Sequence, residues 1–142
     1  MLVAEILKQK GHDVWSVGPD LPLGEACREL ERRRVGAVLV CEDDRVRGVL
    51  SERDVVRAVA RGGAEALSQP VSHYMTADVV FAAPSESVAI LMQRMTDRRI
   101  RHLPVLAEGR LDGVISIGDV VKCQIDEATR EAESLRTYIS AG

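Results

Sequence analysis

The chain contains one motif twice, first as Gly48-Val49-Leu50-Ser51-Glu52-Arg53-Asp54-Val55-Val56 and again as Gly113-Val114-Ile115-Ser116-Ile117-Gly118-Asp119-Val120-Val121. Each copy is typical of an apolar strand that leads through Ser into a helix, with Asp three residues after the Ser. The free N–H groups and the positive dipole end of a helix start attract phosphate. An Asp carboxylate accepts hydrogen bonds from sugar hydroxyls. The motif therefore indicates either a nucleotide site that is used twice or two helix caps.

The two motifs belong to a longer internal repeat. When the chain is slid on itself by 65 residues, the motifs align without a gap, and further identical residues align with them. These pairs include Asp13 with Asp78, Pro19 with Pro84, Arg33 with Arg98, and Arg45 with Arg110. A gapless match of this extent predicts a duplicated unit of about 60 residues.

Both repeats predict the same order of elements, β-α-β-β-α. First strands are expected at 14–17 and 79–82, and the helices after them are expected to have Asp20 and Ser85 as N-caps. Apolar runs at 37–41 and 102–106 predict buried strands with hairpin partners at 46–50 and 111–115. Second helices are expected at 52–60 and 117–126. Because a unit of about 60 residues is marginal alone, we expect the two units to pack sheet to sheet with pseudo-two-fold symmetry.

The predicted fold class is therefore α/β (α+β), with a first repeat at 1–62, a linker at 63–70, a second repeat at 71–126 and a C-terminal helix at 127–142. Around that terminal helix, apolar residues recur every three or four positions: Ile125, Ala128, Ala132, Leu135 and Ile139. So narrow a stripe packs either on the chain's own core or on a second copy of the protein. We favour the second copy, which predicts a homodimer.

Composition excludes several classes of protein. A net charge of −3 and an aromatic content of 3% give no support for binding nucleic acid. The three cysteines are widely spaced, which predicts free thiols rather than disulfides or a zinc site, and no metal is required. No apolar run approaches the roughly 18 residues of a membrane span, and the first residues lack the pattern of a signal peptide. We therefore expect a cytoplasmic protein with no membrane partner.

The whole pattern resembles the tandem CBS domain pair, also called the Bateman module, over almost the whole chain. The residues that carry the resemblance are the paired Gly-h-h-Ser-x-x-Asp motifs (h, apolar), the helices that follow Pro19 and Pro84, and the segments 74–79 and 101–105. The resemblance implies that an adenosyl-containing small molecule binds in a cleft between the two units. The usual ligands are AMP, ADP, ATP, NAD(H) or S-adenosylmethionine.

The resemblance also implies roles for individual residues. The motif Asp holds the ribose hydroxyls, which points to Asp54 and Asp119, and the motif hydroxyl helps at the phosphate, which points to Ser51 and Ser116. Basic residues from the sister unit complete the phosphate site, and the matching pair is Arg101 and His102.

The two sites are expected to be unequal. Arg101-His102 aligns with Gly36-Ala37, and Arg53 aligns with Gly118, so these basic groups occur once each. If Arg101 and His102 cross the cleft as they do in the family, they serve the first motif, where Arg53 adds charge. The motif of Asp119 then has the weaker site, which Lys10 from the first loop partly compensates.

These expectations favour a regulatory module that senses adenine nucleotides and acts through a ligand-dependent conformational or oligomeric change. The alternative is a nucleotide-independent interaction protein that regulates an enzyme or a transporter. An enzyme is not expected, because the sequence has no glycine-rich dinucleotide fingerprint, P-loop or nucleophile elbow.

Overall fold

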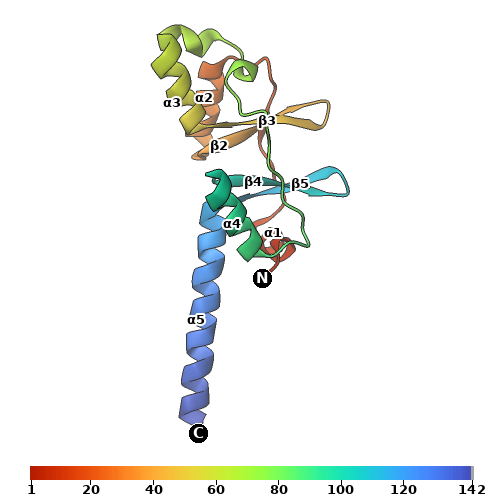
Figure 1. The fold of residues 1–142 in the computed structure, drawn as a ribbon, viewed down its shortest axis with the longest axis vertical. Coiled ribbons are helices and arrows are strands. Elements are labelled where there is room, and N and C mark those ends of the chain that lie inside the picture. Colours follow the sequence, from red (N-terminus) through yellow and green to blue (C-terminus); the bar gives the residue numbers. More distant parts are fainter. Residues whose placement is uncertain (142) are drawn as a thin grey trace. The chain divides into compact units, whose positions relative to one another are not determined.

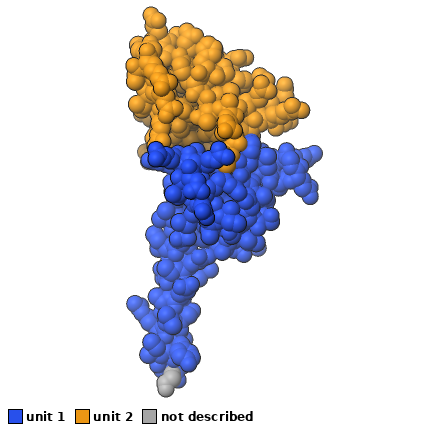
Figure 2. All heavy atoms as spheres, viewed as in Figure 1, with its two compact units in different colours: residues 1–13, 81–142 blue, residues 14–80 orange. Residues whose placement is uncertain are grey.

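The computed structural model describes residues 1–141 and is a mixed α+β structure with a repeated pattern of elements and a C-terminal helix, as predicted (Figure 1). Its contacts divide the chain into two compact units (Figure 2). Unit 2 is residues 14–80, and unit 1 combines residues 1–13 with the chain from residue 81 onward. Residues 1–13 thus belong to unit 1 although they begin the first repeat, and residues 63–80 belong to unit 2 although they comprise the linker and the start of the second repeat. We call these two stretches the exchanged segments.

Unit 2 contains a sheet of three strands in the order β1-β2-β3. Strand β1 (Ser16–Val17) runs parallel to β2 (Ala37–Glu42), and β2 forms an antiparallel hairpin with β3 (Arg45–Ser51). Helix α2 (Leu23–Arg33) precedes the hairpin, helix α3 (Glu52–Gly62) follows it, and the 3₁₀ helices η1 (Gly63–Ser68) and η2 (Val71–His73) complete the unit. The core is aliphatic and is built from Leu23, Ala26, Leu30, Val38, Val40, Leu50, Ala58, Ala66 and Val71.

Unit 1 repeats this plan around a two-stranded antiparallel hairpin of β4 (His102–Ala107) and β5 (Arg110–Ser116). Helix α4 (Val88–Arg98) precedes the hairpin, helix α5 (Ile117–Ala141) follows it, and helix α1 (Val3–Lys10) comes from the start of the chain. The predicted helices at 117–126 and 127–142 form one continuous helix over the described residues. The strand expected at 79–82 is reduced to one parallel bridge between Ala82 and Val105.

The exchanged segments cap the first helix of each hairpin unit through backbone atoms. In unit 2 the Leu23 N–H donates to the Gln69 carbonyl at 2.8 Å, and in unit 1 the Val88 N–H donates to the Met1 carbonyl at 2.9 Å. The predicted N-caps Asp20 and Ser85 are therefore wrong. The actual N-caps are Pro22, which has no side-chain cap, and Ser87, whose Oγ accepts from the Ile90 N–H at 3.3 Å.

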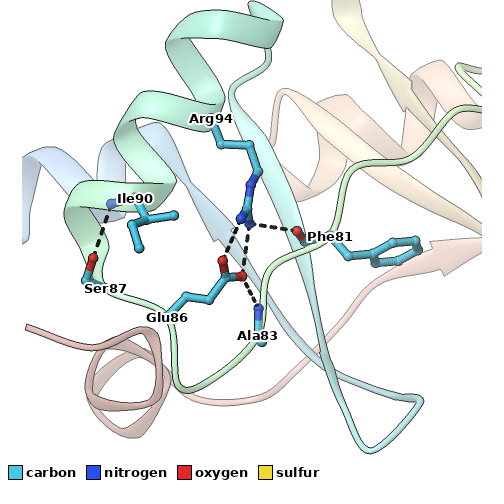
Figure 3. A network of polar contacts seen from close by, with 6 residues as sticks. All are labelled: Phe81, Ala83, Glu86, Ser87, Ile90 and Arg94. Atoms are coloured by element: carbon cyan, nitrogen blue, oxygen red, sulfur yellow. Dashed lines mark hydrogen bonds and ion pairs between the residues drawn. The ribbon is translucent and has the colours of Figure 1, made fainter.

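Arg94 holds the entry to helix α4 in place (Figure 3). Its guanidinium donates to Glu86 Oε1 at 3.0 Å, to Glu86 Oε2 at 2.5 Å and to the Phe81 carbonyl at 2.9 Å. Glu86 also accepts the Ala83 N–H at 2.8 Å. The hydrogen bonds from Arg94 hold the pKa of Glu86 below its ordinary value, so the network carries its full charge at neutral pH. It fixes the loop that leads from residue 81 into the helix.

Candidate functional site

The first motif lies in unit 2, where strand β3 ends at Ser51 and helix α3 begins. Ser51 and Asp54 form a reciprocal capping box: the Asp54 N–H donates to Ser51 Oγ at 3.3 Å, and the Ser51 N–H donates to Asp54 Oδ2 at 3.0 Å. The Ser51 hydroxyl also donates to Asp54 Oδ2 at 3.1 Å. The side chain of Asp54 is thus fixed at the positive end of the helix dipole, where a carboxylate is stabilised.

Thr76 completes this arrangement, and sequence reasoning did not include it among the site residues. Its hydroxyl donates to Asp54 Oδ1 at 3.3 Å. The backbone of Thr76 is joined to Val49 by two hydrogen bonds, of 2.9 and 3.0 Å, so an additional chain segment runs antiparallel to the end of β3. Every hydrogen bond described here to Asp54 comes from a neutral donor, and Asp54 is only 7% exposed.

Gly48 allows Thr76 to come so near. A Cβ at this position would lie 2.9 Å from the Thr76 carbonyl oxygen and 2.7 Å from the Met75 sulfur. The signal in the sequence was therefore the motif glycine, which marks a close approach of backbone to strand. The identity of the approaching segment could not be read from it.

The second motif lies in unit 1 at the junction of β5 and α5, and its geometry matches the first. The Asp119 N–H donates to Ser116 Oγ at 3.2 Å, and the Ser116 N–H donates to Asp119 Oδ2 at 2.8 Å. Here the additional partner is charged: Lys10 Nζ, from the end of α1, lies 2.6 Å from Asp119 Oδ2 and 2.7 Å from the Val114 carbonyl oxygen. The two motifs thus have the same caps and different third partners.

The charge of Lys10 changes the electrostatics of Asp119. Burial by itself raises the pKa of this carboxyl, but the hydrogen bonds from Lys10 Nζ and from the Ser116 N–H outweigh it, and the pKa lies below its ordinary value. Asp119 is therefore an ionised group already neutralised by an ammonium. A cation or sugar hydroxyl that approaches Oδ2 of Asp119 competes with Lys10.

Arg101 and His102 lie in unit 1, beside the second motif. The Ile117 N–H, the first of helix α5, donates to the Arg101 carbonyl at 2.7 Å, and His102 is paired with Ser116 across the β4–β5 ladder. The structure therefore brings Lys10, Arg101, His102, Ser116 and Asp119 into one unit. It places Ser51, Arg53 and Asp54 together in the other, where Arg53 is exposed in the first turn of α3. That Arg101 and His102 contribute to a ligand site at the first motif stays a prediction.

Replacing Lys10 with methionine is expected to destabilise the protein by about 0.5–1 kcal/mol at pH 7, since a partly exposed ion pair is lost. A carboxyl whose folded pKa is depressed contributes stability above its unfolded pKa, about 3.9, and loses it as the pH falls through the folded value. The difference between wild type and variant should therefore shrink as the pH falls from about 7 toward about 3. Urea unfolding at both pH values measures this difference in the free energy of unfolding. Lys8→Met, on the same helix, is the control, and a pH-independent difference would contradict the assignment.

Among residues 1–141, no helix is long and apolar enough to cross a membrane. In the same part of the chain, no three His, Cys, Asp or Glu side chains gather where they could hold a metal ion.

Comparison with known proteins gives a consistent picture. The family model described as "CBS domain" matches residues 3–61 and 71–126. A CBS-domain-containing protein of Agrobacterium tumefaciens has a crystal structure that superposes with a TM-score of 0.86 at 47% identity, over 87% of this chain and 99% of that one. A mitochondrial CBS-domain-containing protein of Arabidopsis thaliana is 31% identical over 99% of this chain and 72% of its own. A CBS domain protein of Pyrobaculum aerophilum, solved with AMP, is 28% identical with a TM-score of 0.74, over 84% of this chain and 89% of that one.

Proposed function

Because the chain belongs to the CBS domain family and carries two copies of the domain, we propose that it is a regulatory module that binds an adenine nucleotide of the AMP, ATP or NAD(H) class. Binding acts through a conformational or oligomeric change, and the protein performs no catalysis of its own. In this proposal the motif of Asp54 provides the tighter of two unequal sites.

The geometry of Asp54 is the observation that carries the proposal. A carboxylate accepts about four hydrogen bonds, and the Ser51 N–H, the Ser51 hydroxyl and the Thr76 hydroxyl already donate to this one and fix its orientation. Two vicinal ribose hydroxyls are suitable donors to such a group, because both can reach one carboxylate. The AMP-bound relative from Pyrobaculum aerophilum supports a ligand that contains ribose.

The phosphate is assigned to the start of α3 and to basic side chains. The start of α3 offers a positive dipole end, and Arg53 in the first turn adds charge, while the Glu52 and Asp54 N–H groups already donate within the chain. Arg101 and His102 are carried over from the family pattern as further phosphate ligands. Lys10 is not part of that pattern, and we propose separately that its charge partly compensates at the second site.

The inequality of the two sites is supported by their third partners. Asp54 has the neutral hydroxyl of Thr76, whereas Asp119 has the ammonium of Lys10 at 2.6 Å. A ribose that binds to Asp119 must displace or share an ion pair, which costs binding free energy. A ribose that binds to Asp54 only rearranges hydroxyl donors.

Regulation follows from differential affinity. A nucleotide shifts an equilibrium between two arrangements only by the ratio of its affinities for them. We propose that the arrangements differ in the contacts of a homodimer or of a regulated protein. We also propose a cytoplasmic location, although one relative is named as mitochondrial.

Isothermal titration calorimetry of the purified protein with AMP, ATP, NADH and S-adenosylmethionine tests the proposal. We expect at least one of them to bind with a dissociation constant below about 1 mM, which corresponds to about 4.1 kcal/mol or more. Absence of binding by all four at millimolar concentration would overturn it. A nucleotide-insensitive pull-down of a protein partner would then favour the interaction protein instead.

A further inference from the structure

The C-terminal half of helix α5 packs on nothing in unit 1. The first half is docked, since Val120 and Cys123 are buried and Glu127 pairs with the N-terminal ammonium at 3.2 Å. Every residue at 128–141 is exposed. Figures 1 and 2 show this half of α5 as a single helix without another element of unit 1 beside it.

A lone helix of this kind needs a partner. Helices shorter than about 15 residues are marginal in water, and most helical stability in proteins comes from packing an apolar face. This segment exposes Leu135 (63%), Tyr138 (79%) and Ile139 (74%), and the docked half adds Val121 and Ile125 to the exposed apolar residues. Exposed side chains of this size on one helix mark an interaction surface.

The spacing of these residues identifies the kind of partner. Positions 121, 125, 128, 132, 135 and 139 are separated alternately by four and three residues: Val121, Ile125, Ala128, Ala132, Leu135 and Ile139. This heptad seam has a period of about 3.5 residues, which is the signature of a two-stranded coiled coil. We call these six residues the α5 seam. The two central alanines would let the helix axes come close together.

Charges beside the α5 seam select the orientation. One flank carries Lys122, Thr129 and Arg136, and the other carries Gln124, Glu131 and Tyr138. In a parallel pair each flank faces the opposite flank of the second copy. Glu131 of each copy then lies beside Arg136 of the other, which gives two attractive contacts. In an antiparallel pair like flanks meet, which places Lys122 against Arg136 and Glu131 against its own counterpart. Charge complementarity thus favours the parallel arrangement.

We propose that the α5 seam binds a second copy of this chain as a parallel two-stranded coiled coil. The proposal is independent of the nucleotide site, because it uses no residue that has been assigned to nucleotide binding. The coiled coil would join the two copies at the C-terminal ends of their α5 helices.

Sedimentation analysis of the full chain at a protein concentration of about 0.1 mM tests the interface. The wild type is expected to be a dimer, and Leu135→Asp is expected to weaken dimerisation by about a hundredfold or more and to lower the helical circular dichroism signal. Thr137→Asp introduces the same charge on the opposite face of the helix and should leave the dimer intact. A monomeric wild type, or a Leu135→Asp protein that remains as tightly dimeric as Thr137→Asp, would overturn the proposal.

Charge exchange tests the orientation. In a parallel pair, Glu131→Arg replaces two attractive contacts by two repulsive ones and should weaken dimerisation about tenfold, while the double variant Glu131→Arg/Arg136→Glu should return to within about threefold of wild type. In an antiparallel pair the single variant keeps a like-charge contact and changes little. The double variant would then dimerise more tightly than wild type, because Lys122 would meet the carboxylate introduced at position 136 of the second copy. That second pattern would refute the parallel arrangement.

Discussion

The free energy of unfolding of the Gly48→Ala variant is expected to be about 2–3 kcal/mol lower than that of the wild type. The new Cβ would lie 2.9 Å from the Thr76 carbonyl oxygen and 2.7 Å from the Met75 sulfur. The Met75 side chain can turn away, but the carbonyl belongs to a backbone that two hydrogen bonds join to Val49. Overpacking of this kind costs about 1–3 kcal/mol, and disturbance of those hydrogen bonds adds to it.

Thermal melts measure this effect, and a fall in Tm of roughly 6–12 °C is expected for a chain of this size. Gly18→Ala is the matched control, since nothing lies within 4 Å of a Cβ there and the residue belongs to the same unit. If the two variants melted at the same temperature, the close approach of Thr76 to β3 would be wrong. Nucleotide affinity should fall along with stability, because Thr76 would no longer reach Asp54.

The hairpins and their following helices could be predicted from the sequence because their signals are local. Alternation of apolar residues and the Ser-x-x-Asp motif lie within a few positions of each other, and the repeat doubles each signal. Both capping boxes appear where the pattern indicated them. The family resemblance was likewise confirmed by the match over 3–61 and 71–126.

The errors share a physical cause, which is that distant backbone can replace a local signal. Asp20 and Ser85 looked like N-caps, but carbonyls of Gln69 and Met1 accept the first helical N–H groups instead. Those acceptors come from the exchanged segments, and no local pattern records them. Thr76 was missed for the same reason, since it is 22 positions from Asp54 in sequence.

The continuity of α5 illustrates a different limit. The chain becomes more polar after residue 126, where the helix stops packing on unit 1, and this change resembles a boundary between two helices. The backbone contains no glycine or proline there that would end the helix. A change of environment was therefore interpreted as a change of element.

The Asp54→Asn variant is expected to bind its nucleotide about 5- to 150-fold more weakly than the wild type, a loss of about 1–3 kcal/mol. Asparagine keeps the shape of the side chain and one acceptor oxygen, so the cap on α3 is largely retained. It loses the charge and one of the two oxygens that the ribose hydroxyls need. Calorimetry measures the affinity, and unfolding curves establish that the variant is folded.

Asp119→Asn is the matched control, because the second motif has the same cap and a different third partner. Its effect on the tighter site should be small, about threefold or less, if the two sites are unequal as proposed. A larger loss in Asp119→Asn than in Asp54→Asn would reverse the assignment of the tighter site.

A ligand that lacks the ribose hydroxyls separates a direct contact from an indirect one. If Asp54 accepts hydrogen bonds from the ribose, the wild type should lose affinity for the 2′,3′-dideoxy form of its nucleotide, and Asp54→Asn should lose little further. The two losses then overlap, because both remove the same interaction. If they added instead, Asp54 would act on affinity through the shape of the β3–α3 junction, and the ribose would be held by other groups. The carboxylate would then be a helix cap alone, which is the other role that its position at the start of α3 allows.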